Sequence, residues 1–207
     1  MTNNTSAGRS TKNDFGSKGW LMIVISGLCY FFFAGMINDG LNIIVANFSA
    51  EHGVDYNACL ASATPAAWFG IIGVAFWTVV VQKLGTRKVG AISLVLGAVS
   101  YALYGVVSTV TGFFVVTALV NFMAYGFCNT AAQVMIAHWF PTRKGLALGW
   151  ATMGTNLSSA VFVPLLMVLV GMGGVNGSFF AVGVLVLITA VIYGLLCKEK
   201  EEVSEEK

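Results

Sequence analysis

The sequence predicts an all-α membrane protein in which six transmembrane helices form one bundle. The first observation is composition: of 207 residues, 57% are hydrophobic and 10% are charged, and the mean hydropathy is +0.81. A soluble domain could not cover that much apolar surface, whereas a protein with several membrane spans has no need to. The second observation is the division of the apolar residues into six long stretches, and the third is the position of the basic residues between them.

Each apolar stretch is long enough, at about 1.5 Å per residue, to cross the ~30 Å hydrocarbon core of a bilayer as a helix. In chain order we place the spans near Trp20–Asn47, Ala58–Gln82, Val89–Val107, Gly112–Trp139, Gly145–Val170 and Gly177–Cys197. The bundle then occupies residues 20–197, between a polar cytoplasmic tail (residues 1–19) and a charged cytoplasmic tail (residues 198–207). No short apolar region with a small-residue cleavage site follows the first polar residues, so we expect the first span itself to direct insertion.

The basic residues give the orientation. All 11 lysines and arginines fall in the two tails or in the loops after the second and fourth spans: Arg9, Lys12, Lys18, Lys83, Arg87, Lys88, Arg143, Lys144, Lys198, Lys200 and Lys207. The loops on the opposite side carry only Glu51, His52 and Asp55. Because basic loops stay in the cytoplasm, we expect a multi-pass protein of the plasma (inner) membrane with both termini cytoplasmic.

The chain lacks the common signatures of enzymes. It has no HExxH or GxSxG motif, no P-loop and no pair of carboxylates within a span. Its four cysteines lie in four different apolar segments, and none forms a CxxC or a Cys/His pair, so we expect free thiols. We therefore expect no enzymatic activity, no cofactor, no metal and no nucleic-acid partner. The informative residues are polar side chains inside the spans, because hydrocarbon tolerates them only with a partner or water.

Asp39 is the one acidic residue within a predicted span, in the outer half of the first. Asn38 and Asn42 lie four residues apart on either side of it, so the three polar side chains can share one helix face. One interpretation is a carboxyl group that faces a cavity and takes part in proton or substrate transfer. The other is that the helix is already leaving the membrane, which would put Asp39 in the outer interface.

The fourth span carries a stripe of polar side chains. Asn121, Tyr125, Asn129 and Gln133 recur at intervals of four residues, which places them along one slowly turning face of a helix. Four such groups cannot face lipid. They contact either other helices, as polar links between spans, or a water-filled cavity, where they suit a small polar or anionic solute.

The fifth span begins with small residues. Gly145 and Gly149 lie four residues apart, and the absence of Cβ there lets another helix come close, so we predict a packing role for both. Asn156, further along the same span, could add a polar contact to a cavity.

The fourth and fifth spans are joined by a short sequence, Trp139-Phe140-Pro141-Thr142-Arg143-Lys144-Gly145. Pro141 ends the helix before it, because its ring does not fit the helical hydrogen-bond ladder. The pattern aromatic-Phe-Pro-x-basic-basic-Gly-x-Ala-x-Gly resembles the junction at this position in the major facilitator superfamily. Within that family it is most similar to the oxalate/formate antiporter and monocarboxylate transporter branch. The resemblance implies a transporter in which the first and fourth helices line a central cavity.

Residues 78–88, after the second span, resemble the cytoplasmic gating motif of the same family. The segment keeps the basic residues and one glycine of the motif but has Thr78 in place of its first glycine and Gln82 in place of its aspartate. The resemblance implies a cytoplasmic gate made of Gln82, Lys83, Gly85, Arg87, Lys88, Arg143 and Lys144. Because glutamine carries no charge, its contacts at that gate should be weaker than those of an acid.

The resemblance covers almost the whole chain but only the first half of the family's twelve-helix architecture, whose six-helix halves each consist of two inverted three-helix units. Monocarboxylate transporters have a lysine in the first span, and this chain has no Lys or Arg inside any predicted span. Because the resemblance covers only the first half of that architecture, it implies half of a secondary active transporter of a small organic anion, a monocarboxylate or dicarboxylate. A proton or a counter-anion would drive it, and a second six-helix bundle, from a separate chain or a second copy, would complete it.

Two other functions stay open on the sequence alone. A six-helix bundle could serve as a membrane assembly subunit without transport, since a fold does not fix a function. The chain could also be a truncated carrier fragment without activity. An intramembrane enzyme is the least favoured class, for want of a nucleophile and base.

Overall fold

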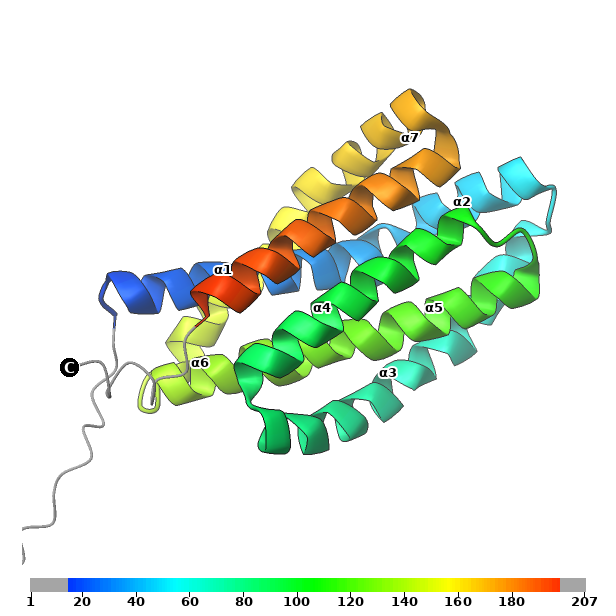
Figure 1. Ribbon diagram of the computed structural model, residues 1–207. Helices are drawn as coiled ribbons and strands as arrows, with labels where there is room; N and C mark the ends of the chain where they lie inside the picture. The colour runs from blue at the N-terminus through cyan, green and yellow to red at the C-terminus, as the bar shows by residue number, and fades with distance from the viewer. Residues whose placement is uncertain (1–14, 198–207) are drawn as a thin grey trace, which may run out of the picture.

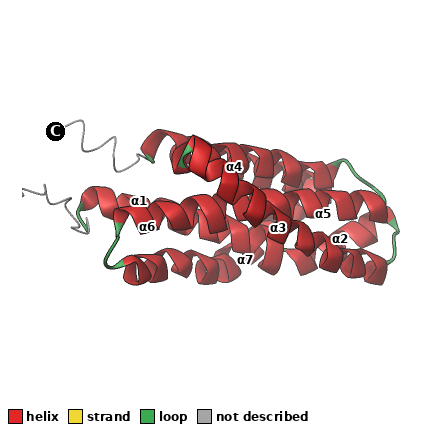
Figure 2. Ribbon diagram, turned by 90° about the horizontal axis from the view of Figure 1, so that it is seen from below, coloured by secondary structure: helices red, strands yellow, loops and turns green. Residues whose placement is uncertain are grey.

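The structure, a computed structural model, describes residues 15–197, and every regular element in that range is helical. Figure 1 shows long helical rods that run back and forth between the two ends of the molecule, and Figure 2 shows short loops joining them at both ends. The predicted C-terminal tail and most of the N-terminal tail lie outside the described residues. So do the basic residues Arg9, Lys12, Lys198, Lys200 and Lys207.

Five helices of the described residues are long and apolar enough to cross a membrane: Ser17–Asp39, Tyr56–Leu84, Thr86–Gly105, Val110–Trp139 and Lys144–Leu196. The last, α7 (Lys144–Leu196), covers both the fifth and the sixth predicted spans. Its backbone leaves the helical region at Gly174 (φ 70°, ψ 179°), a conformation that glycine adopts readily, and the chain reverses direction there (Figure 1). We name residues 144–173 the first arm of α7 and residues 175–196 its second arm.

The first and fourth spans are interrupted by π-helical segments. The first consists of α1 (Ser17–Ala34), the π segment η1 (Gly35–Asp39) and α2 (Leu41–His52). The fourth consists of α5 (Val110–Tyr125), the π segment η3 (Gly126–Ala132) and α6 (Gln133–Trp139). Such segments are rare and frequently occur at functional sites. These segments interrupt spans that the sequence predicts as single helices, and the first span extends five residues beyond its predicted end at Asn47.

Capping residues and Pro141 fix several helix ends. The Asp55 side chain accepts a hydrogen bond from the Ala58 backbone N–H at 2.8 Å and begins α3 (Tyr56–Leu84). Thr109 caps α5 in the same way. At the junction, α6 ends at Trp139, just before Pro141, as predicted. The third span is α4 (Thr86–Ala102), followed by the short 3₁₀ turn η2 (Leu103–Gly105).

Glycines allow the first span to lie directly against the first arm of α7. A Cβ atom on Gly154 would overlap the carbonyl oxygen of Gly27, and a Cβ on Gly27 would lie 3.5 Å from the carbonyl oxygen of Ala151. Closer to the N-terminal ends of both helices, the rings of Trp20 and Trp150 meet edge to face with centroids 5.6 Å apart. Small residues therefore bring these two helices into backbone contact.

Two further helix pairs complete the bundle. The second span, α3, packs along α5, where the rings of Phe76 and Phe122 have centroids 5.4 Å apart. The third span, α4, packs along the second arm of α7, and Arg87 Nε donates a hydrogen bond to the Gly194 carbonyl oxygen at 2.8 Å. The first span thus packs mainly against the first arm of α7, and the fourth packs against both α3 and α4, which positions the site described next.

Candidate functional site

Each π segment begins with a glycine that lies under an aromatic ring of a neighbouring helix. A Cβ on Gly35 would lie 2.5 Å from Cγ of Phe162, on the first arm of α7. A Cβ on Gly126 would lie 2.7 Å from Nε1 of Trp77, on α3. The Trp77 indole N–H also donates to the carbonyl oxygen of Phe122 at 3.0 Å. The two π segments are therefore held in the same manner, each by a ring that only glycine admits.

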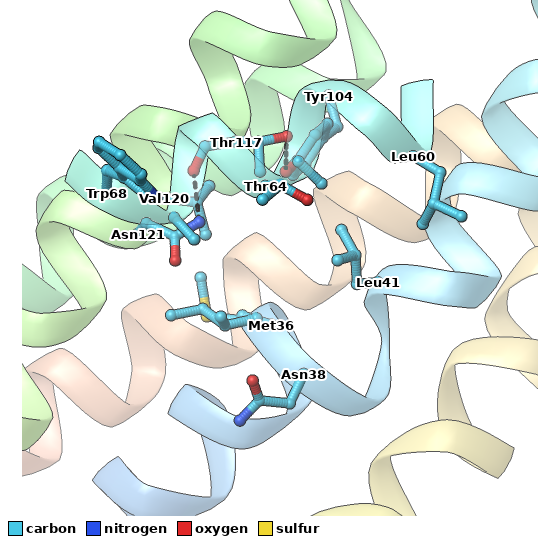
Figure 3. A pocket seen from close by; sticks show the side chains of 13 residues that line it. Met36, Asn38, Leu41, Leu60, Thr64, Trp68, Tyr104, Thr117, Val120 and Asn121 are labelled. Atoms are coloured by element: carbon cyan, nitrogen blue, oxygen red, sulfur yellow. Dashed lines mark hydrogen bonds between the residues drawn. The ribbon is translucent and has the colours of Figure 1, made fainter. Parts of the chain in front are cut away.

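A cavity of about 440 Å³ lies between the first, second and fourth spans (Figure 3). Its lining comes from the first half of α3 and the first half of the fourth span, so it occupies the half of the bundle farthest from the basic junction. The residues that carry its polar or aromatic character are Asn38, Thr64, Trp68, Tyr104, Thr117 and Asn121. No charged side chain lines it.

Asn121 is a deeply buried polar residue of this cavity, with 3% of its surface exposed. Its Nδ2 donates to the Thr117 carbonyl oxygen at 2.9 Å, while its Oδ1 is buried and has no hydrogen-bond partner among the described residues. Figure 3 shows the Asn121 side chain directed into the cavity, on the side of Met36. The structure thus leaves one acceptor atom of the cavity wall unsatisfied.

The three polar residues predicted around Asp39 separate in the structure. Asn38 lines the cavity, whereas Asn42 is exposed and Asp39 does not belong to the lining. Asp39 is half-buried, and its Oδ2 is buried without a hydrogen-bond partner among the described residues. The α-helical spacing assumed from the sequence does not apply, because Asn38 and Asp39 belong to the π segment η1.

The four residues of the predicted stripe on the fourth span also lie in different environments. Only Asn121 reaches the cavity. The ring of Tyr125 packs edge to face on Phe33 with centroids 5.1 Å apart, and Gln133 Nε2 donates to Asn129 Oδ1 at 3.5 Å. A row of every fourth residue turns by roughly 40° at each step of an α-helix, so its members face different neighbours. The stripe therefore divides into a cavity residue, a packing residue and an exposed polar pair.

The predicted residues of the fifth span lie on an exposed face of α7. Asn156 is exposed and does not line the cavity. No described atom lies within 4 Å of a Cβ built on Gly145 or Gly149, so neither glycine makes a close approach inside this bundle. Gly154, on the same helix, makes that approach instead. Packing at Gly145 and Gly149 stays a prediction for a neighbour outside the chain.

The predicted gate residues lie at helix ends on the basic side of the bundle: Gln82, Lys83, Gly85, Arg87, Lys88, Arg143 and Lys144. Arg87 is held by its hydrogen bond to Gly194 at the end of the second arm. Close by, the Tyr193 hydroxyl group donates to the Thr86 carbonyl oxygen at 3.3 Å. These contacts tie the start of α4 to the end of α7. The sequence predicts Arg87 as a gate residue, whereas this contact depends on the fold.

Three cavity residues with hydroxyl groups were not among the predicted site residues. Thr117 precedes Asn121 by four residues and extends the polar stripe by one step, so the same spacing could have identified it. Tyr104 donates from its hydroxyl group to Thr117 Oγ1 at 2.8 Å, and Thr64 lies on the wall contributed by α3. Nothing local in the sequence marks Tyr104 or Thr64, because the fold alone brings them to the cavity.

Among the described residues no group of three or more His, Cys, Asp or Glu side chains could hold a metal ion. The four cysteines, Cys29, Cys59, Cys128 and Cys197, are buried and free. The lining residues of the cavity offer hydrogen bonding and apolar contact.

Comparison with known proteins places the chain in a family. The sequence profile of the Major Facilitator Superfamily matches residues 20–207. The chain is 25% identical over 182 residues to monocarboxylate transporter 9 of Mus musculus, which covers 85% of this chain and 34% of that protein. The same figures hold for monocarboxylate transporter 9 of Rattus norvegicus, so the chain spans about a third of the length of these relatives. Because the profile matches nearly all of the chain, the chain belongs to the Major Facilitator Superfamily, a family of transporters and not of enzymes.

Proposed function

We propose that this chain is one half of a secondary active transporter that moves a small organic anion by alternating access, with proton coupling or anion exchange. The observation that carries the proposal is the pair of π-interrupted spans, the first and the fourth, beside a cavity with an unsatisfied polar group. The name of the similar rodent proteins, monocarboxylate transporter 9, supports a monocarboxylate or dicarboxylate as the substrate.

The proposed architecture is six spans arranged as two inverted three-helix units. A two-fold axis in the membrane plane would exchange the first span with the fourth, the second with the fifth, and the third with the sixth. Such an axis would map the contact of Gly35 with Phe162 onto that of Gly126 with Trp77. It would also map the contact between α4 and the second arm of α7 onto itself. The repeated glycine–ring arrangement supports this layout.

The proposed carrier needs a second six-helix bundle, from a separate chain or a second copy. A carboxylate requires positive charge or donors, and the cavity lining contains no lysine, arginine or histidine. The exposed glycines Gly145 and Gly149 offer a face against which another helix could pack. We place the assembly in the plasma (inner) membrane, with both termini in the cytoplasm, because the basic loops lie on one side.

Uptake by reconstituted protein tests the proposal. The tagged chain is purified in mild detergent from its source membranes, so that an associated bundle is retained, and is placed in liposomes. Labelled three-carbon monocarboxylate and four-carbon dicarboxylate are then offered with an inward proton gradient or with internal counter-anion. We expect saturable uptake under at least one of these conditions. Uptake no faster than in protein-free liposomes under every condition would contradict the proposal and favour an assembly role.

A matched pair of variants assigns the site. Asn129→Leu should raise KM while the amount of protein inserted stays the same, because we propose that its amide, which lies outside the cavity lining, contacts the solute on its path through the bundle. Asn57→Leu, at an exposed position near the start of α3, should leave KM unchanged. Equal KM values for the two variants would reduce Asn129 to a contact between helices.

A further inference from the structure

We propose that residues 198–207 dock on the basic end of the bundle through their glutamates and supply there the negative charge that Gln82 lacks. The basic end is the end that holds the junction before α7, and its described cations are Lys18, Lys83, Arg87, Lys88, Arg143 and Lys144. The docking itself does not depend on transport, whereas its role in holding the cytoplasmic gate rests on the proposed function.

The basic end contains no acidic residue among those that the structure describes. Residues 15–197 include three acidic residues: Glu51 and Asp55 lie at the opposite end, and Asp39 lies within the first span. The first turns of α1, α4 and α7, which all begin at the basic end, also contain no acidic residue. Because a cation at the positive end of a helix dipole is unfavourable, carboxylates brought to this end would be attracted by the cations and by the dipoles.

Residues 198–207 carry the charge that is missing there. They contain five of the nine acidic residues of the chain, and residues 201–206 contain four glutamates and no cation. The gating motif that residues 78–88 resemble has an aspartate at the position of Gln82. The chain therefore lacks an acid where the resemblance places one and has a cluster of acids a few residues beyond its last helix.

The end of α7 lies against the start of α4, which brings residues 198–207 to the basic end. Arg87 Nε donates to the Gly194 carbonyl oxygen at 2.8 Å, and a Cβ on Gly90 would overlap the ring of Tyr193. Figure 1 shows the end of α7, in red, at the same end of the bundle as the start of α1, in blue. Six residues of extended chain reach up to about 20 Å, so Val203 can lie over the loop between α3 and α4.

Several weak ion pairs can act together here. An exposed ion pair contributes little by itself, but glutamates on one tethered segment meet the cations at a high effective concentration. Bound glutamates would link the end of α7 to the loop between α3 and α4 and to the junction before α7. Such links would restrict the opening of the basic end.

Cross-linking in protein purified as for the uptake assay tests the docking. A short bismaleimide joins Val203→Cys to Leu84→Cys, since Leu84 is 46% exposed beside Lys83 and the native cysteines are buried. The cross-linking rate is divided by the rate at which a monofunctional maleimide labels the same thiols, which removes changes in thiol reactivity. The tail variant removes four negative charges: Glu201→Gln, Glu202→Gln, Glu205→Gln and Glu206→Gln. The matched control of equal length removes the cations: Lys198→Gln, Lys200→Gln and Lys207→Gln.

We expect the tail variant to cross-link at about one fifth of the rate of the unchanged segment or less, and the control at least as fast as the unchanged segment. Raising the salt from about 0.01 M to about 1 M should slow the unchanged segment in the same way, because the Debye length falls from ~30 Å to ~3 Å. Lys83→Gln combined with Lys88→Gln should also slow it, by removing charge from the other side of the contact.

Equal rates in the tail variant and the unchanged protein, at low and at high salt, would overturn the docking and leave residues 198–207 as a solvated segment. Liposomes test a second occupant of the basic end. If cross-linking depends on the glutamates in neutral lipid but is lost in phosphatidylglycerol, the docking is overturned as well, since lipid headgroups would then occupy that end.

Uptake tests the role at the gate. The tail variant should lower the initial uptake rate while the amount of inserted protein stays the same, and Gln82→Glu, which restores the acid of the motif, should recover part of the loss. Uptake that the tail variant leaves unchanged would overturn the gate role. If the unchanged protein shows no uptake, the proposed function and the gate role fail together, while the cross-linking rates still decide the docking.

Discussion

The ring of Phe162 occupies the space that any side chain at position 35 would need. A Cβ on Gly35 would lie 2.5–2.7 Å from Cγ, Cδ1 and Cδ2 of that ring, well inside van der Waals contact. Gly35 is the first residue of the π segment in the first span, and Phe162 comes from the first arm of α7. The shape of the first span at Asn38 and Asp39 thus depends on a residue more than a hundred positions away.

Gly35→Ala should destabilise the protein by about 1–3 kcal/mol, because the added methyl group overpacks against Phe162. Gly149→Ala is the control: no described atom lies within 4 Å of its Cβ, and alanine favours a helix by up to about 1 kcal/mol over glycine. Denaturant unfolding in detergent measures both. Phe162→Leu combined with Gly35→Ala should cost less than the sum of the two changes. Equal stability of Gly35→Ala and Gly149→Ala would contradict the contact.

Trp77→Phe should cost about 0.5–1.5 kcal/mol, since it removes the N–H that donates to the Phe122 carbonyl oxygen. Trp68→Phe, at a tryptophan that is 70% exposed, should change the free energy of unfolding far less. The same unfolding assay compares them. If the two variants are equally stable, the Trp77 hydrogen bond makes no net contribution to the free energy of unfolding.

Arg87→Ala should destabilise the bundle by about 1–2 kcal/mol, because it breaks the charge-assisted hydrogen bond to Gly194 at the end of α7. Lys88→Ala removes an exposed neighbouring charge and serves as the control. A loss of uptake in Arg87→Ala with unchanged stability would instead assign Arg87 to the gate.

Asp39→Asn should abolish or uncouple uptake driven by a proton gradient in the reconstituted assembly, because the amide cannot take up and release a proton as the carboxyl group does. Exchange of internal for external anion would continue if coupling alone is lost. The measurement is the initial uptake rate with and without the gradient. Unchanged uptake and an unchanged response to the gradient would remove Asp39 from the mechanism.

Cysteine labelling tests the proposed orientation. In sealed cells, a membrane-impermeant maleimide should label Val106→Cys but reach Gln82→Cys only after permeabilisation, since the two lie at opposite ends of the bundle. The native cysteines are buried and should not contribute. The reverse pattern would place the basic loops outside the cell.

Local sequence decided where the chain crosses the membrane. Long apolar runs, the helix-capping residue Asp55 and the helix-ending residue Pro141 located the first four spans within a few residues. This was possible because hydrophobicity and helix ends depend on neighbours along the chain. The charge pattern by itself predicts the orientation. The family resemblance, visible at the junction before Gly145, is confirmed by the profile match over residues 20–207.

The site required the tertiary structure. The π segments at Gly35 and Gly126 are held by Phe162 and Trp77 from other helices. No local propensity of the sequence predicts these π segments. Of the polar residues predicted for the site, only Asn38 and Asn121 line the cavity. Helix packing and the π segments decide which way each of these side chains faces. The sequence alone determined the class, the family and most of the spans. The fold alone decided which oxygen atom is buried without a partner, since that depends on every helix around it.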